Sequence, residues 1–385
     1  MKIDKIVKGI LLLISYPIYP ISFLFPRSKK KWLFGSFGKF NDNSRYLFEY
    51  CVKNEVAINA YWVSKNKNEY IYVRKLGFPT IYKYSLSGFF HLLTSKVYIY
   101  SSYVNNISFF TSGNAVLVNL WHGIPLKKIE FDISTSPLNE YFKDANWVMK
   151  ALYPHHHKRE TLLLCPGEYL YSTIFKSAFK KDKNNIIDAN YPRISFIKEK
   201  IKQENKNINE KKFNITYTPT WRDNATNFIE SKLALLEEID EIAGKKGFRF
   251  NIKLHSNSIF NPDIFLKLKN IYVVDNKIDP IELLLNTDCL ITDYSSIYFD
   301  FLFLNRPIIF FQYDKFDYLK NRELYNTKIN NLPGKLCKND AELIELLSAN
   351  INTNEYENDR QKIIKLISSE NNSDYIIQRI KESLQ

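Results

Sequence analysis

The chain has 385 residues, a net charge of +13 and a pI near 9.2. Hydrophobic residues make up 45% and charged residues 25%, which is typical of a globular protein and excludes disorder over most of the length. The length favours two domains of ordinary size. The positive charge favours a polyanionic partner, such as nucleic acid, anionic lipid or a phosphorylated substrate, without choosing among them.

The four cysteines, Cys51, Cys165, Cys289 and Cys337, show no paired spacing. This pattern indicates thiols in a reducing compartment and argues against a disulfide framework or a zinc site.

Residues 9–25 form an apolar run, GILLLISYPIYPISFLF, with cations on both sides. No small-residue cleavage site follows it, which argues against a signal peptide. Its length is at the lower limit for a membrane span, and Pro17 and Pro20 interrupt it. We therefore predict a membrane-associating segment over residues 1–31, with apolar side chains in the bilayer boundary and lysines on anionic headgroups. A buried first helix of the fold is the alternative.

After this segment, short apolar runs rich in β-branched and aromatic residues alternate with polar, helix-like stretches, which predicts an α/β fold with parallel sheets. In the first half the predicted strands are residues 32–34, 60–63, 80–84, 97–100, 116–120 and 147–149. In the second half they are residues 213–217, 248–254, 271–274, 289–292 and 307–311.

Helices in the second half are predicted over residues 233–242 and 296–304, and over a short stretch that Asp279 caps and Pro280 opens. An amphipathic helical pattern covers residues 356–384. The lysine-rich stretch 199–212 is typical of a domain junction or a solvated helix. We therefore expect one α/β domain over residues 32–205 and a second over residues 206–385.

Four polar clusters follow predicted strands, where ligands of open α/β sheets bind. The first is WHGIPLKK, residues 121–128. His122 is a candidate general base, and Gly123 permits a tight turn and a close approach of substrate. Lys127 and Lys128 add positive charge. A histidine satisfied by a backbone carbonyl is the structural alternative.

The second and third clusters are TPTWRDN, residues 218–224, and KLHSN, residues 253–257. Arg222 is a candidate for a two-pronged hydrogen bond to a phosphate, and Trp221 suits either base stacking or a core. His255 beside Lys253 is placed to donate to a phosphate oxygen. A surface loop and a capped histidine are the structural alternatives.

The fourth cluster is ITDYSSIYFDF, residues 291–301. Asp293 ends an apolar strand, and Ser295 and Ser296 begin the following helix. A helix N-terminus with two hydroxyls favours an anion such as a diphosphate. Simple capping of the helix is the alternative.

Together the clusters predict a site for a phosphorylated substrate. The sequence has no Walker motif and no complete G-x-G-x-x-G. His155, His156 and His157 are consecutive, which is poor geometry for one metal ion, and no carboxylate cluster indicates catalytic magnesium.

These motifs, in this order and spacing, resemble the CDP-glycerol glycerophosphotransferase family, as do RPIIFFQYDKFDY from Arg306 and LPGKL from Leu332. The resemblance covers roughly residues 116–335. It implies two Rossmann-like domains facing a central cleft, of GT-B type, on the cytoplasmic face of the bacterial cell membrane. It also implies catalysis without metal or cofactor.

The resemblance assigns roles to the clusters. His122 is expected to be the catalytic base, and Asp293 to belong to the catalytic site, either positioning a histidine or binding the donor. Residues expected to bind the donor are His255, Arg222, Ser295, Ser296, Thr220 and Lys253. Gly123, Lys127 and Lys128 are expected to support the acceptor side. Two departures from the family pattern are Ser256, where a proline is common after the histidine, and the stretch Pro192-Arg193-Ile194-Ser195, which weakens any role for Arg193.

The expected partners are a CDP-glycerol or CDP-ribitol donor, a prenyl-diphosphate-linked acceptor and an anionic membrane surface, and not nucleic acid. The reaction implied is attack of an acceptor hydroxyl on the donor phosphorus, with release of CMP, in teichoic acid or capsule synthesis. Two other functions remain open: a GT-B nucleotide-sugar glycosyltransferase, and a basic membrane- or nucleic-acid-binding protein without catalysis.

Overall fold

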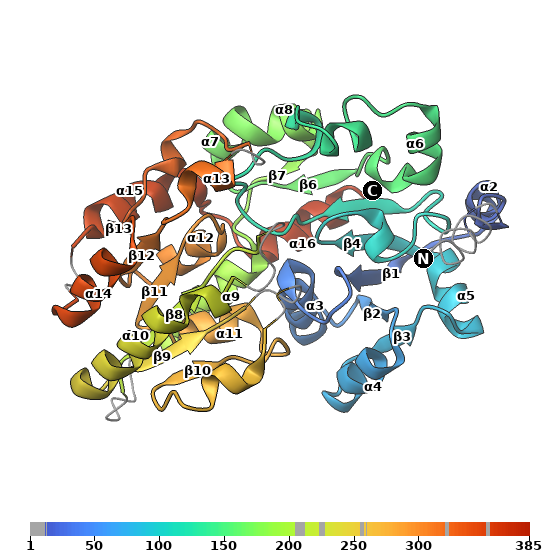
Figure 1. Cartoon of the computed structure of the whole chain (residues 1–385). Coiled ribbons are helices and arrows are strands. Elements are labelled where there is room, and N and C mark those ends of the chain that lie inside the picture. Colours follow the sequence, from blue (N-terminus) through green and yellow to red (C-terminus); the bar gives the residue numbers. More distant parts are fainter. Residues whose placement is uncertain are drawn as a thin grey trace. The chain divides into compact units, whose positions relative to one another are not determined.

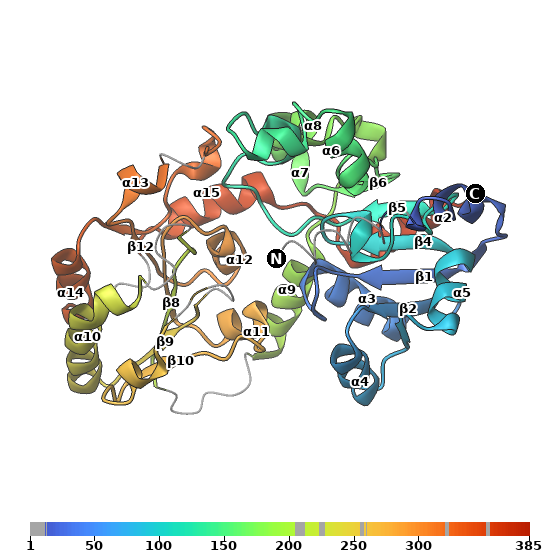
Figure 2. The same ribbon diagram turned by 45° about the vertical axis from the view of Figure 1, so that its right-hand side comes forward.

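The computed structural model describes residues 12, 14–204, 212–222, 228–254, 258, 260–319, 323–351 and 355–385. The chain divides into two compact units, each built around one parallel β-sheet (Figures 1 and 2). The first unit comprises residues 1–122, 129–196 and 368–385, and the second comprises residues 123–128 and 197–367.

The first unit contains a seven-stranded sheet in the order β3-β2-β1-β4-β5-β6-β7. Its strands are β1 (Ser28–Gly35), β2 (Asn59–Ser64), β3 (Thr80–Tyr82), β4 (Ser95–Tyr100), β5 (Val116–Asn119), β6 (Leu162–Leu164) and β7 (Ile186–Ile187). Its helices are α2 (Ile18–Ile21), α3 (Asp42–Asn54), α4 (Lys67–Lys75), α5 (Leu86–Thr94), α6 (Trp147–Leu152), α7 (Gly167–Leu170), α8 (Lys176–Phe179) and α16 (Ser373–Glu382). All neighbouring strands pair in parallel.

The second unit contains a six-stranded parallel sheet in the order β10-β9-β8-β11-β12-β13. Its strands are β8 (Asn214–Thr218), β9 (Arg249–Ile252), β10 (Ile271–Val273), β11 (Cys289–Thr292), β12 (Ile308–Phe311) and β13 (Lys335–Cys337). Its helices are α10 (Leu233–Lys246), α11 (Pro280–Leu285), α12 (Ile297–Leu302), α13 (Lys315–Leu319), α14 (Asp340–Ser348) and α15 (Glu357–Ile367). Helix α9 (Pro192–Glu204) contains the division between the units.

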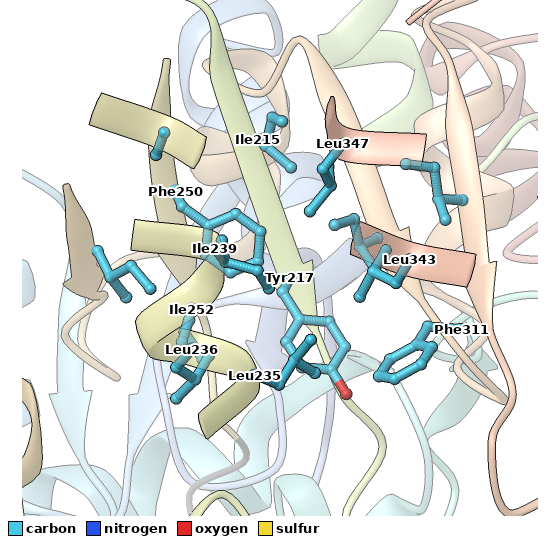
Figure 3. Close-up of a cluster of buried hydrophobic side chains, with 14 of the residues drawn as sticks. Ile215, Tyr217, Leu235, Leu236, Ile239, Phe250, Ile252, Phe311, Leu343 and Leu347 are labelled. Carbon is cyan, nitrogen blue, oxygen red and sulfur yellow. The ribbon is translucent and has the colours of Figure 1, made fainter. Parts of the chain in front are cut away.

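The core of the second unit lies between its sheet and the helices α10 and α14. Ile215 and Phe250 point from the strands toward Leu236 and Ile239 of α10 and Leu343 of α14 (Figure 3). These side chains are almost completely removed from water. Helix α10 buries one face because its leucines and isoleucines recur at helical spacing, and it ends at Gly247, whose φ of +75° glycine adopts without strain.

The predicted α/β class and both parallel sheets are confirmed. The expected strand over residues 147–149 is wrong, because Trp147 begins α6. The side chain of Asn146 accepts a hydrogen bond from the backbone N–H of Met149, and such a cap favours a helix over a strand. The sequence reading also missed the short strands β6, β7 and β13.

The division between the units differs from the expected boundary near residue 205. Residues 368–385 also belong to the first unit, although we expected them in the second. Helix α16 buries Ile376, Ile377 and Ile380 in the first unit. The backbone N–H of Asn190 donates to the carbonyl of Asn371 at 2.9 Å, which fixes the returning chain. Residues 205–211, half of the predicted junction, lie outside the described residues.

Candidate active site

Both sheets reverse their strand order at one point, between β1 and β4 in the first unit and between β8 and β11 in the second. At such a point the loops that follow the two strands run to opposite sides of the sheet and leave a crevice at its carboxyl edge, where ligands of open α/β sheets bind. Two of the four predicted clusters lie in these loops, after β8 and β11, and a third lies in the loop after β5, the strand next to β4. The three loops contain Thr220, Asp293 and His122, respectively.

The His122 turn follows β5 and has an unusual backbone. Trp121 has φ of +53° and Gly123 has φ of +137°. For a tryptophan this left-handed conformation costs free energy, about 1–3 kcal/mol, so the surroundings must enforce it. Asn119 does so by accepting a hydrogen bond from the backbone N–H of Trp121 at 2.9 Å, and Asn43 donates to the Trp121 carbonyl at 2.8 Å.

Arg193 holds the same turn. Its Nη1 donates to the His122 carbonyl at 3.0 Å and to Oδ1 of Asp42 at 2.7 Å. Asp42 lies directly after the β1 loop and also has a left-handed backbone, with φ of +65°. Loops after β1, β5 and β7 therefore fix the histidine together. The sequence reading weakened the role of Arg193, whereas the structure makes it a positioning residue.

The imidazole of His122 is set up to accept a proton. Its Nδ1 lies 3.3 Å from the carbonyl of Ser101, so a neutral ring donates from Nδ1 and leaves Nε2 as the acceptor. Part of the side chain is exposed, yet surrounding protein atoms exclude much water, and this desolvation lowers the pKa of His122 below its usual 6.5. Arg193 also lowers it, whereas Asp42 and the Ser101 carbonyl raise it. The ring is therefore neutral at pH 7.

Lys127 and Lys128 belong to the second unit and pair with the segment before Tyr325. Lys128 forms an ion pair of 3.0 Å with Glu323, and its backbone N–H donates to the Glu323 carbonyl. The ammonium of Lys127 lies 5.3 Å from the ring centre of Tyr318. Both cations thus take part in fixing this stretch of chain.

In the second unit, Asp293 lies at the end of β11 and is 1% exposed. Its carboxylate accepts hydrogen bonds from the backbone N–H and the hydroxyl of Thr220 and from Nη1 of Arg222. These bonds tie the loop after β8 to the loop after β11. The two loops lie on either side of the point where the strand order reverses, which we call the switch point. Asp293 therefore holds the two loops together, and its expected place in the catalytic site stays a prediction.

The side chain of Arg222 is also bonded to other protein groups. Its Nε and Nη2 donate to the two carboxylate oxygens of Asp314, at 2.9 and 3.1 Å, and Nη1 also donates to the Thr220 carbonyl. The guanidinium lies over the rings of Tyr294 and Tyr318 and is 8% exposed. Burial opposes its charge, but Asp293 and Asp314 outweigh that effect and raise the pKa of Arg222. Each guanidinium nitrogen thus donates to a protein oxygen, and the phosphate contact expected from the sequence stays a prediction.

The remaining donor residues have more accessible positions. Ser296 is exposed directly before α12, and Ser295 and Thr220 are partly exposed. The ammonium of Lys253 donates to the carbonyls of Asp275 and Ile278, at 2.6 and 3.3 Å, and so holds the loop before α11. His255 lies outside the described residues. Among the residues that are described, no group of three His, Cys, Asp or Glu side chains is placed to hold a metal ion.

The structure adds positioning residues that the sequence reading missed: Asp42, Asn43, Asn119 and Asp314. Asn119 ends β5, and the other three follow β1 or β12 by a few residues, so their placement at strand ends is the signal that could have found them. The fold and site thus define an α/β protein of two Rossmann-like units. The first carries a neutral histidine after β5, whose turn contacts residues that follow β1 and β4, and the second carries loops joined by an ion pair.

Comparison with known proteins identifies the family. A model described as CDP-Glycerol:Poly(glycerophosphate) glycerophosphotransferase matches residues 18–382, so this chain belongs to that enzyme family. It is 28% identical to the teichoic acid poly(glycerol phosphate) polymerase of Bacillus spizizenii, over 91% of each chain. It is also 28% identical to the teichoic acid glycerol-phosphate transferase of Staphylococcus aureus, over 87% of this chain and 88% of that protein.

Solved structures agree on the fold. The wall teichoic acid polymerase TagF matches with a TM-score of 0.74 at 24% identity, covering all of this chain and 98% of that one. A structure of MnaA with UDP from S. aureus matches with a TM-score of 0.57 at 11% identity, covering 92% and 97%. At these identities the likeness shows the two Rossmann-like domains and not the chemistry.

Asp42→Asn should lower the pKa of His122 further, because the aspartate charge favours the imidazolium. Asparagine tolerates the left-handed backbone at this position, so the turn should persist. An NMR titration of the His122 ring measures the shift, with the exposed Asp144→Asn as the control. An unchanged or raised pKa in Asp42→Asn would contradict the electrostatic role assigned to Asp42.

Asp293→Ala should destabilise the second unit by about 3–5 kcal/mol, because it leaves a buried guanidinium without one of its two carboxylates. Urea unfolding measures the change. The exposed Asp263→Ala is the matched control and should change stability by no more than about 0.5 kcal/mol. Wild-type stability in Asp293→Ala would show that the network does not hold the two loops.

Proposed function

We propose that this enzyme transfers glycerol phosphate from CDP-glycerol to a hydroxyl of a lipid-linked saccharide or polymer, in teichoic acid or capsule synthesis, and releases CMP. Family membership supports the reaction class, and the similarity to teichoic acid polymerases and transferases supports the pathway class. The observation that carries the mechanism is the neutral His122, whose Nδ1 faces the Ser101 carbonyl and whose Nε2 is left to accept a proton.

The proposed step is an in-line displacement at phosphorus. The acceptor oxygen forms a bond to the phosphorus that carries glycerol, and its proton passes to Nε2 of His122. The bond from that phosphorus to the bridging oxygen of the diphosphate breaks, and CMP leaves with the electron pair. Hydrogen-bond donors near the phosphates stabilise the charge that develops.

On the donor side, we assign the phosphate contacts to Thr220, Ser295 and Ser296, with His255 and Lys253 as the neighbouring cluster. Arg222 and Asp293 act through the loops that they join. The GT-B arrangement of the two units is part of this proposal and is supported by two Rossmann-like sheets and by the similarity to TagF.

His122→Ala should reduce CMP release from CDP-glycerol by about 10²–10⁴-fold, because loss of a general base typically costs that factor. Binding of CDP-glycerol should survive. The purified enzyme is assayed with a prenyl-diphosphate-linked saccharide against CDP-glycerol, CDP-ribitol and a panel of nucleotide sugars. His91→Ala, a histidine that packs on Tyr61 in the same unit, is the control and should retain turnover.

Near-normal turnover in His122→Ala would remove the base assignment. Turnover of nucleotide sugars alone would make the chain a glycosyltransferase. Salt-sensitive binding to plain DNA without donor turnover would favour the basic binding protein instead.

We also propose that residues 1–31 attach the enzyme to the cytoplasmic face of the membrane, as a peripheral or monotopic protein. Among the described residues no helix is both long and apolar enough to cross a membrane. Ile14 and Leu24 are 65% and 81% exposed, which does not fit the alternative of a buried first helix. The other side of the segment is docked, since Tyr19 stacks on Phe109 at 4.8 Å.

Exposed side chains elsewhere in the first unit support this attachment. Leu86 and Phe90 on α5 and Trp147 on α6 are exposed. Both helices contact the N-terminal segment, since Arg27 donates to the Leu92 carbonyl and Tyr16 to the Ala151 carbonyl. Figures 1 and 2 show α2 and α5 at the same end of the first unit. Exposed Lys29 and Lys30 suit anionic headgroups.

Leu24→Glu should weaken binding to anionic phospholipid vesicles, because it places a charge on the apolar side of the segment. Vesicle flotation at low and high salt measures the bound fraction. Leu266→Glu replaces a leucine of equal exposure, 80%, in the second unit and should bind like wild type. Equal loss of binding in both variants would count against a membrane role for the segment.

A further inference from the structure

The first unit contains a cavity of about 240 Å³ that the reaction described above does not use. Its walls come from the chain after β4, from the end of β5, from the 3₁₀ turn Pro154–His156 and from the end of α8. Tyr103, Glu130, His156, Phe179 and Lys180 are among its lining residues. The volume lies just below the roughly 300 Å³ of the smallest ligand pockets, so it suits a small polar group better than a whole nucleotide.

The inner wall offers neutral hydrogen-bonding groups and aromatic faces. The Tyr103 hydroxyl donates to Oε1 of Glu130 at 2.6 Å, and burial raises the pKa of Glu130 to about 8, so this carboxyl is largely protonated at pH 7. Burial lowers the pKa of His156 to about 4, which keeps its ring neutral. Among the described residues, no group bonds to the buried Nδ1 of His156.

The cations of the cavity lie on its more open side. Arg159 and Lys180 are exposed, and the Lys180 ammonium lies 4.2 Å from the ring centre of Phe131. Lys158 also lines the cavity, and its ammonium donates to the Tyr19 hydroxyl at 2.7 Å. Tyr19 belongs to α2, within the membrane-associating segment. The cavity therefore adjoins that segment through Lys158.

On another side the cavity adjoins the His122 turn. Asn119 lines the cavity and also accepts the hydrogen bond from the Trp121 backbone. Phe179 lines it as well, and its ring packs edge-on against Trp121 at 4.8 Å. A molecule in the cavity would thus touch residues that contact the His122 turn and residues that contact the proposed membrane segment.

We propose that this cavity binds one sugar unit of the lipid-linked acceptor, an inference that rests on the glycerophosphotransferase function proposed above. Neutral donors and acceptors beside aromatic rings suit the hydroxyls and apolar faces of a sugar. Lys158, Arg159 and Lys180 suit the diphosphate that follows the sugar. Because Lys158 contacts Tyr19, a prenyl chain that follows the diphosphate would lie beside the membrane-associating segment.

The test measures acceptor affinity separately from donor affinity. The probe is a disaccharide diphosphate with a short prenyl chain, soluble without vesicles. Tyr103→Phe removes one hydroxyl, and His156→Ala removes one ring. In both variants we expect the KM for the probe to rise about tenfold or more, because each variant loses a buried hydrogen bond to the probe. The KM for CDP-glycerol should stay within about twofold of wild type, and calorimetry should show the same loss of probe binding without donor.

Two matched controls are Tyr84→Phe and His91→Ala, which change the same residue types outside the cavity lining. Both should behave like wild type, and thermal unfolding identifies any variant that fails to fold. Tyr103→Phe keeps the inference testable if His156→Ala unfolds.

Unchanged probe binding in folded cavity variants, or a rise in the donor KM alone, would overturn the inference while leaving the proposed reaction intact. If wild type releases no CMP but binds the probe, and the cavity variants lose that binding, the reaction fails and the cavity remains a saccharide site. Neither turnover nor probe binding by wild type would overturn both.

Discussion

Between β1 and β4, and again between β8 and β11, successive crossovers leave the sheet on opposite sides, so the loops that follow these strands separate at its carboxyl edge. Several residues with proposed roles depend on that separation. In the first unit it places the loop of Asp42 and the loop of Ser101 around His122. In the second it places the Thr220 loop opposite the Asp293 loop. The positions of these loops follow from strand order and not from any single motif.

The two switch points are stabilised by different means. In the second unit a buried ion pair, Arg222 with Asp293, joins the loops, and Asp314 holds the outer face of the guanidinium. A buried pair gives little net stability but penalises any arrangement in which it separates, so it fixes geometry. In the first unit, polar side chains hold the left-handed Trp121 against its own preference. The backbone of the turn is fixed in this way, and the hydrogen bond of Nδ1 to the Ser101 carbonyl orients the His122 ring.

In our proposals, the acceptor site and the membrane attachment both belong to the first unit. The N-terminal segment docks through Tyr19 on one side and exposes Leu24 on the other. Lys158 contacts Tyr19 and lines the cavity that adjoins the His122 turn. A lipid-linked substrate requires this combination, because its reacting hydroxyl and its membrane anchor belong to one molecule.

The sequence by itself determined the fold class, most of the strands and the loops that carry chemistry, because buried parallel strands are continuous apolar runs and polar motifs end them. It determined the family as well, through the WHG and TDYSS motifs. It could not distinguish a ligand-binding role from a structural role for Arg222 and Asp293. An arginine held by two carboxylates and one available to a ligand have the same sequence pattern. Only the tertiary structure brought Asp42 and Arg193, far apart in the chain, to the His122 turn, and returned residues 368–385 to the first unit. Those contacts depend on how strands are ordered in the sheet, which local residue patterns do not encode.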